Sequence, residues 1–174
     1  MKNIVLIGFM GSGKTVIARQ LSKILKRKII DTDKIIEKRQ KKKIKEIFKL
    51  YGEKFFRKVE TDAVKYAGMQ KNKIIATGGG VVIKPQNIKI LKKNGIIVYL
   101  KNTFETSCKR LKNKKDRPLF KINNLKETRL LFNKRLKLYK RAADIIIKTD
   151  NKSIERVTNE IIKKLDKYKI CKQK

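Results

Sequence analysis

Eight residues near the start of the chain constrain its fold more than any other stretch. Residues 8–15 read Gly-Phe-Met-Gly-Ser-Gly-Lys-Thr, after an apolar run at 3–7 and before an amphipathic segment that begins near Thr15. A glycine, four residues and then Gly-Lys-Thr is the pattern of a P-loop, in which backbone N–H groups wrap a polyphosphate above a helix N-terminus. The pattern predicts that Lys14 reaches the outer phosphates and that the Thr15 hydroxyl ligates Mg²⁺. The alternative is a glycine-rich turn that binds nothing.

The rest of the chain continues the order of strand and helix in which this loop is found. Short apolar runs predict strands, and amphipathic segments between them predict helices. This alternation indicates an α/β fold with a parallel sheet, right-handed crossovers and helices on both faces. No flexible linker or internal repeat divides residues 1–174, which are expected to form one domain. The predicted strands are 3–7, 28–30, 74–77, 96–100 and 144–148.

The formal net charge of +34 would by itself indicate a nucleic-acid or anionic-membrane partner. The 49 lysines and arginines, however, are spread through every segment and are not gathered into one basic arm. Aromatic residues are not interleaved at a spacing that would make a stacking platform. We therefore expect a compositional bias and no specific nucleic-acid partner. The absence of histidine leaves carboxylates, lysines and arginines for any acid–base chemistry.

No segment has the length or the flanking residues of a membrane span or an export signal. The longest apolar runs, such as 96–100, fall far short of the roughly 20 residues that a membrane span requires. Residues 1–11 lead into the P-loop and not into a small-residue cleavage site. Cys108 and Cys171 are too few for a disulfide framework and have no metal-binding spacing. These features predict a soluble, cytoplasmic protein with no membrane partner, and we expect a monomer.

Two carboxylates follow the second predicted strand, in the sequence Asp31-Thr32-Asp33. A cap for the next helix accounts for one of them, because Asp and Thr both cap helices well. Ligands of open α/β sheets bind at the carboxyl ends of the strands, and a Mg-nucleotide there needs acidic partners. The pair is therefore a candidate for a metal–nucleotide site, with a helix cap as the alternative.

Three further features are each ambiguous when taken alone. Gly78, Gly79 and Gly80 follow the third predicted strand, and a run so costly in backbone entropy indicates that the backbone lies close to a ligand. Residues 112–122, polar and charged around Arg117-Pro118, fit a lid over a charged ligand, with an ordinary lysine-rich loop as the alternative. Arg57 and Glu60 share one helix face, where a surface ion pair is the simple explanation.

Together, the motifs keep one characteristic order and spacing. They are Asp31-Thr32-Asp33, the Gly52-Glu53 to Phe56-Arg57 and Glu60 run, Thr77-Gly78-Gly79-Gly80, Arg117-Pro118-Leu119, and Arg135 with Tyr139, Ala143 and Asp144. In this order they resemble the shikimate kinases, a family of the nucleoside-monophosphate-kinase-like P-loop group. The resemblance extends from Asn3 to about Ile162, and its motifs are jointly strongly specific.

The resemblance implies a P-loop kinase fold, a three-layer αβα sandwich around a five-stranded parallel sheet of order 2-3-1-4-5. It implies a small substrate-binding subdomain at about 32–60 and a lid at about 112–123. The implied reaction is ATP-dependent phosphorylation of the 3-hydroxyl of shikimate, which yields shikimate 3-phosphate and ADP for aromatic amino-acid biosynthesis. Mg²⁺ is the implied cofactor, and ATP is the co-substrate.

The resemblance also implies roles for single residues. Asp31, with Thr15, is implied as the partner of Mg²⁺ through water. Arginines pair bidentately with carboxylates and an aspartate accepts from hydroxyls, which suits the implied shikimate cradle of Asp33, Arg57, Arg135 and the backbone of Gly79 and Gly80. The implied ATP contacts are Gly11, Ser12, Gly13, Lys14, Thr15, Arg110 on adenine and Arg117 at the phosphates. The implied catalytic residues are Lys14, Asp33 and Arg117.

Two alternatives remain. One is another small-molecule kinase of the same fold, of the gluconate or nucleoside-monophosphate type. The other is a non-catalytic P-loop module that binds RNA through its charge. Arg57, residues 78–80 and Arg135 together favour a small polyol that carries a carboxylate over both alternatives.

Overall fold

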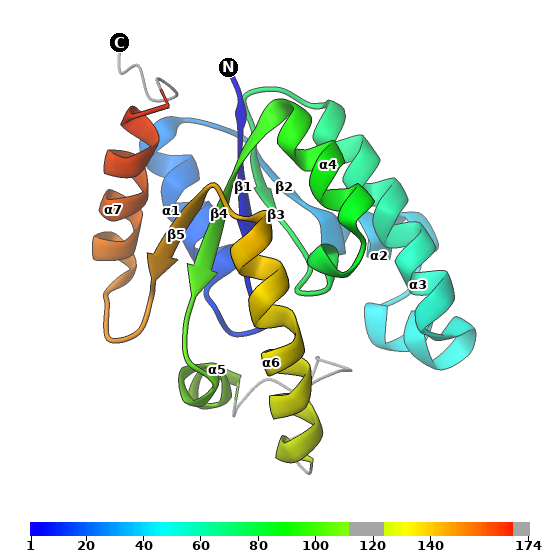
Figure 1. Cartoon of the computed structure of the whole chain (residues 1–174). Helices are drawn as coiled ribbons and strands as arrows, with labels where there is room; N and C mark the ends of the chain where they lie inside the picture. Colours follow the sequence, from blue (N-terminus) through cyan, green and yellow to red (C-terminus); the bar gives the residue numbers. More distant parts are fainter. Residues whose placement is uncertain (112–123, 169–174) are drawn as a thin grey trace.

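A computed structural model describes residues 1–111 and 124–168. They form three layers, with a parallel sheet between two layers of helices (Figure 1). Its strands run in the order β2-β3-β1-β4-β5, and every pairing between neighbours is parallel. The predicted α/β class and the 2-3-1-4-5 order are confirmed. The strands are β1 (Asn3–Ile7), β2 (Ile29–Asp31), β3 (Ile74–Ala76), β4 (Gly95–Lys101) and β5 (Ile145–Lys148).

Two of the helices begin at a start signal in the local sequence. The side chain of Ser153 accepts a hydrogen bond from the N–H of Arg156 and caps α7 (Ile154–Asp166), and Pro85 occupies the first position of α4 (Pro85–Asn94). The short 3₁₀ helix η1 (Val81–Ile83) is a feature that the sequence did not indicate. The α-helices are α1 (Lys14–Leu25), α2 (Thr32–Gln40), α3 (Ile44–Met69), α4 (Pro85–Asn94), α5 (Phe104–Leu111), α6 (Leu125–Ala142) and α7 (Ile154–Asp166).

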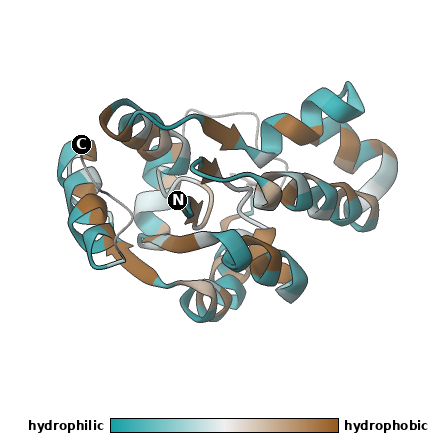
Figure 2. Ribbon diagram, turned by 90° about the horizontal axis from the view of Figure 1, so that it is seen from above, coloured by the Kyte–Doolittle hydropathy of each residue, from teal (hydrophilic) through white to brown (hydrophobic). Residues whose placement is uncertain are grey.

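Two apolar cores fill the space between the sheet and its helices. Side chains of α1 and α7, such as Leu21 and Ile161, pack on one face of the sheet. Side chains of α3, α4 and α6, such as Val64, Leu91 and Phe132, pack on the other. In Figure 2 the strands are coloured almost throughout as hydrophobic, whereas each helix shows both colours. This is the pattern of a parallel sheet covered on both faces.

A third, smaller cluster lies between α2 and α3 and contains Ile36, Ile47, Phe56 and Ala63. Within α3 the backbone breaks at Gly52, whose φ of 72° and ψ of 179° are not helical. A positive φ is costly for residues with a Cβ, which explains the glycine. The first helical run ends at this residue, and a new run begins just after it.

Within the described residues, no helix combines the length and the apolar character that crossing a membrane would require.

Candidate active site

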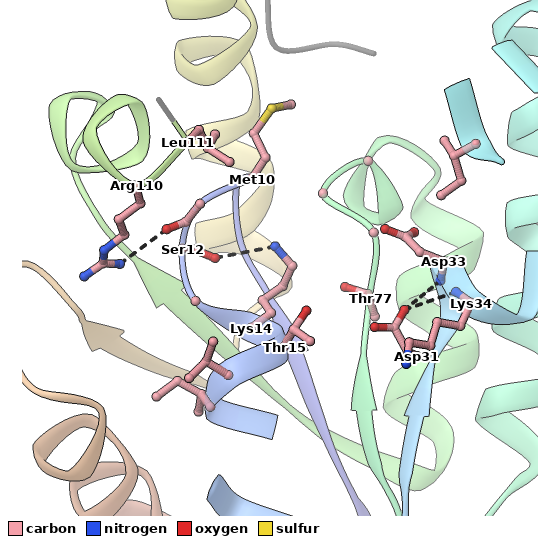
Figure 3. Close-up of a pocket in the computed structure, with 18 of the residues that line it drawn as sticks. Met10, Ser12, Lys14, Thr15, Asp31, Asp33, Lys34, Thr77, Arg110 and Leu111 are labelled. Atoms are coloured by element: carbon pink, nitrogen blue, oxygen red, sulfur yellow. Dashed lines mark hydrogen bonds between the residues drawn. The ribbon is translucent and has the colours of Figure 1, made fainter. Parts of the chain in front are cut away.

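A cavity of about 900 Å³ opens at the carboxyl ends of the strands, as expected for an open α/β sheet. The P-loop lines one side of it, and the segment that follows β2 lines the other. Figure 3 shows Lys14 and Thr15 facing Asp31 and Asp33 across this space. The remaining lining comes from α3, from the glycines after β3, from Arg135 on α6 and from Thr149 after β5. Most of the residues that the sequence singled out are therefore brought together.

The P-loop holds its lysine against its own backbone. Lys14 Nζ donates to the carbonyl oxygens of Gly8 at 2.8 Å and Phe9 at 3.0 Å. No side chain caps α1 at Gly13, and the first turn of α1 contains no acidic residue. The start of α1 therefore presents backbone N–H groups and a positive dipole end to the cavity, which is the arrangement that binds phosphates.

The two aspartates after β2 have different surroundings. Asp31 Oδ1 accepts from the backbone N–H of Asp33 at 3.0 Å and of Lys34 at 3.3 Å, so Asp31 is the N-cap of α2. The cap alternative is correct for this residue, and it occupies only one of the two carboxylate oxygens. Asp33 lies over the glycine run, because a Cβ on Gly78 would come within 2.6 Å of Asp33 Oδ1. Thr32 is buried and accepts from the Gly78 N–H at 3.1 Å, which ties the two segments together.

Arg57 forms a buried ion pair, so the surface-pair explanation was wrong. Its NH1 donates to Glu60 Oε2 at 2.8 Å, and the two residues are 6% and 1% exposed. The Arg57 Nε and NH2 both donate to Glu53 Oε1, at 3.0 and 2.8 Å. Burial acts to lower the pKa of Arg57, but the two glutamates outweigh it and raise that pKa, so the guanidinium stays charged. Burial also raises the pKa of Glu60, although Arg57 opposes this shift.

Two of the three glycines, Gly78 and Gly80, lie in close contact with side chains of the cavity. A Cβ on Gly80 would lie 2.1 Å from Arg57 NH1, so the guanidinium could not occupy its place beside any larger residue. The Gly79 carbonyl oxygen accepts from both Arg135 NH1, at 3.3 Å, and Tyr139 Oη, at 2.5 Å. The backbone of the run therefore binds Arg135 directly and leaves room for the guanidinium of Arg57.

Arg135 is a buried cation, and one of its hydrogen-bond donors has no partner within the described part of the chain. The residue is 3% exposed, and its Nε is buried without a hydrogen-bond partner among the described residues. Burial lowers the pKa of Arg135, and the nearby charge of Arg57 lowers it further. Buried polar groups in proteins are almost always satisfied, so an orphan donor in a cavity marks the place of a ligand. A guanidinium forms its strongest hydrogen bonds with anions, which favours an anionic ligand at Arg135.

At the far end of the P-loop, Arg110 links the loop to the segment after β5. Its guanidinium donates to the carbonyl oxygen of Gly11 at 3.3 Å and to that of Thr149 at 2.9 Å (Figure 3 shows Arg110 beside the loop). Sequence reasoning did not mark Thr149, and it placed Glu60 in a motif beside Arg57 without assigning it to the cavity, although both residues line it. Arg117 and the lid at 112–123 lie outside the described residues.

The oxygen donors for a metal are few. Among the described residues, no group of three or more acidic, cysteine or histidine side chains could hold a metal ion. Thr15 and Asp31, the predicted ligands, both line the cavity. Mg²⁺ in nucleotide sites is held by one or two protein oxygens, the phosphates and water. The donor set therefore fits a magnesium ion that arrives with a nucleotide.

Comparison with known proteins decides the family. The family model for shikimate kinase matches residues 10–166. The chain belongs to the shikimate kinase family. It is 45% identical to the shikimate kinase of Caldanaerobacter subterraneus subsp. tengcongensis over 170 residues, 97% of this chain and 99% of the relative. It is 44% identical to that of Dictyoglomus turgidum over 163 residues, 91% of this chain and 94% of the relative.

Solved structures support the same family assignment. The shikimate kinase from Acinetobacter baumannii in complex with shikimate matches with a TM-score of 0.92 and 33% identity, over 98% of this chain and 96% of that one. A gluconokinase from Sinorhizobium meliloti matches with a TM-score of 0.60 but only 12% identity, over 96% of this chain and 93% of that one, which shows a shared fold alone. The chain is accordingly a phosphotransferase of the shikimate pathway that uses ATP to phosphorylate shikimate.

Proposed function

We propose that the cavity transfers the γ-phosphoryl group of Mg·ATP to the 3-hydroxyl of shikimate, with the nucleotide on the P-loop and the substrate between α3, α6 and the glycine run. The observation that carries this assignment is the unpartnered Arg135 Nε, buried beside Arg57. A carboxylate between these guanidinium groups would satisfy the donor and offset the charge of Arg135. Shikimate has one carboxylate and several hydroxyls, which suits this arrangement.

Carboxylates on the same side of the cavity are suited to the hydroxyls. Asp33 lines the cavity over Gly78, and Glu60 Oε1 is a buried acceptor without a hydrogen-bond partner among the described residues. A hydroxyl donor that reaches Glu60 would lower the cost of burying that carboxyl. Asp33 is the residue proposed to accept from the 3-hydroxyl and to take its proton as the new bond to phosphorus forms.

The nucleotide side is assigned on the same principle of charge matching. The loop of Gly11, Ser12 and Gly13 would wrap the phosphates, and Lys14 would exchange its loop carbonyls for phosphate oxygens. Arg110 would lie on adenine, where it already bridges the P-loop and Thr149. On the resemblance alone, Arg117 is proposed to meet the phosphates and to act with Lys14 and Asp33 in catalysis.

The metal would be held by Thr15 and, through water, by Asp31. When bound, Mg²⁺ supplies positive charge that offsets the phosphate oxygens. Around it, the chain's own groups position the reactants: Lys14 holds phosphate oxygens and Asp33 orients the hydroxyl. Phosphoryl transfer needs little covalent help from a protein, so positioning and charge account for the catalytic role of these residues.

The region 32–60 is proposed to act as a substrate-binding subdomain. The separate cluster of Ile36, Ile47 and Phe56 and the break at Gly52 support this division. A monomeric state, a cytoplasmic location and the absence of a specific nucleic-acid partner stay predictions from the sequence. Filter binding at physiological salt tests the last of these, since non-specific binding through charge falls steeply as salt rises.

Replacing Arg135 with glutamine tests the assignment of the substrate side. Calorimetry should show shikimate affinity lowered by about tenfold or more, the usual cost of losing a charge-assisted hydrogen bond, with Mg·ATP binding unchanged. Arg141→Gln, at the exposed end of the same helix, is the control and should bind both ligands normally. Unchanged shikimate affinity in Arg135→Gln, with normal Mg·ATP binding, would remove Arg135 from the substrate site.

A further inference from the structure

The guanidinium of Arg57 is held by two carboxylates that differ in burial. The Glu60 side chain is 2% exposed and accepts a hydrogen bond from Arg57 NH1, whereas the Glu53 side chain is 55% exposed. Glu60 can therefore move little, while Glu53 can turn into water. Glu53 is also the first residue after the break at Gly52, so the chain on its N-terminal side is not continuous helix.

The two glutamates occupy different edges of the guanidinium. Glu53 Oε1 accepts from Nε at 3.0 Å and from NH2 at 2.8 Å, and this is one of the edges on which arginine binds a carboxylate bidentately. A substrate carboxylate that pairs with this edge must replace Glu53. Because Glu60 keeps its bond to NH1 at 2.8 Å, the guanidinium stays in place during the exchange.

We propose that Glu53 is an internal competitor of the substrate carboxylate on Arg57 and thereby determines the affinity and the charge selectivity of the site. The proposal rests on the proposed function, which assigns Arg57 to the shikimate carboxylate. A neutral polyol cannot displace the Glu53 carboxylate from a guanidinium, whereas an anionic ligand can. The exchange discriminates in favour of carboxylate-bearing substrates and lowers their affinity by the strength of the Glu53–Arg57 contact.

The competitor role and a simple positioning role predict opposite changes in shikimate affinity when Glu53 is removed. If Glu53 only holds Arg57 in place, its loss must weaken shikimate binding. If Glu53 competes, its loss must strengthen binding, because Glu60 alone positions the guanidinium. Loss of Glu60 must weaken binding in either case, since that carboxylate is the buried one.

Calorimetry of Glu53→Gln with shikimate, without nucleotide, separates the two roles. We expect the Kd for shikimate to fall by about three- to tenfold, because the charge-assisted hydrogen bonds of Glu53 are weakened to neutral ones. The Kd for the methyl ester of shikimate, which lacks the negative charge, should not change. Asp62→Asn is the matched control: it removes one carboxylate from the same helix, has 49% side-chain exposure and pairs with Lys65 instead of Arg57. It should leave both constants unchanged.

Weaker or unchanged shikimate binding in Glu53→Gln overturns the competitor role, and so does an equal gain with the ester. Arg57→Lys, measured in parallel, keeps this result distinct from the proposed function. If Arg57→Lys binds shikimate normally, Arg57 does not take the carboxylate and both proposals fail at this residue. If Arg57→Lys weakens binding and Glu53→Gln does not strengthen it, only the competitor role fails.

Discussion

The carboxylate of Asp31 accepts a hydrogen bond from the backbone N–H of Asp33 at 3.0 Å, so that one aspartate fixes the backbone that carries the other. Asp31 is thereby the cap of α2, while Asp33 extends over Gly78 into the proposed substrate side of the cavity. The two residues are adjacent in space but are committed to different partners. Removal of the charge should therefore impair the enzyme in a different way at each of the two residues.

For Asp31→Asn we expect an intact fold, because asparagine caps a helix as well as aspartate does. Activity should fall and be partly restored by extra Mg²⁺, with shikimate affinity little changed. For Asp33→Asn we expect loss of shikimate binding and of turnover, with no rescue by the metal. Calorimetry with shikimate and with Mg·ATP on both variants measures this. If Asp31→Asn loses shikimate and Asp33→Asn responds to Mg²⁺, the two roles are reversed.

Lys14→Ala should abolish turnover and leave the fold intact. The lysine contacts loop carbonyls and does not belong to either apolar core, so its removal creates no core cavity. We expect kcat to fall by at least about a hundredfold, the cost of losing one group that stabilises developing charge. Lys23→Ala, exposed on the same helix, is the control. A Lys14→Ala enzyme with near-normal kcat would contradict the assignment of the P-loop.

Gly80→Ala should damage the substrate site through contact and not through backbone strain. Gly80 has φ −95° and ψ −4°, which alanine adopts readily, but its Cβ would lie 2.1 Å from Arg57 NH1. The buried guanidinium must then shift from its place beside Glu60. We expect the KM for shikimate to rise about tenfold or more and the KM for ATP to stay unchanged, consistent with the cost of overpacking. Steady-state kinetics with each substrate varied in turn would disprove this if the shikimate KM were normal.

Asp150 should contribute stability that depends on pH. It accepts from the Thr103 N–H at 2.9 Å and from the Thr106 hydroxyl at 2.7 Å, joining the start of α5 to the segment after β5. Burial acts to raise the pKa of Asp150, but these hydrogen bonds outweigh it and lower that pKa below its usual 3.8. A lowered folded-state pKa means that the stabilisation is present above pH 3.8 and is lost as the pH falls through the folded value.

Asp150→Asn should therefore be less stable than the parent by about 1 kcal/mol near pH 7, and the difference should shrink as the pH falls below 3.8. Urea unfolding at several pH values measures both enzymes. A difference that stays constant down to pH 3 would show that the charge of Asp150 is not what stabilises the contact.

Much of the fold follows from local pattern, and its strand order came from the resemblance. Residues within one turn determine each of four features. These are the strand before the P-loop, the cap at Asp31, the helix break at Gly52 and the start of α4 at Pro85. Signals of this range are readable from sequence alone. The sheet order is not local, and it was predicted because the motifs resemble those of one family.

The electrostatics of the site could not be read in the same way. Arg57 and Glu60, three residues apart, look alike on a solvated helix and on a buried one, and only the packing around α3 buries them. The two hydrogen bonds to the Gly79 carbonyl oxygen come from Arg135 and Tyr139 on α6, which is far away in the sequence. Leu130 is apolar yet exposed, because it lies on the face of α6 opposite the buried Thr128 and Phe132.

A coupled assay of ADP release, with shikimate, gluconate and nucleoside monophosphates offered in parallel, tests the central claim most directly. The buried guanidinium pair and the family to which the chain belongs predict ADP release that depends on shikimate and on Mg²⁺, with little release for the other acceptors. Release that depends on gluconate or on a nucleoside monophosphate, and not on shikimate, would contradict the account.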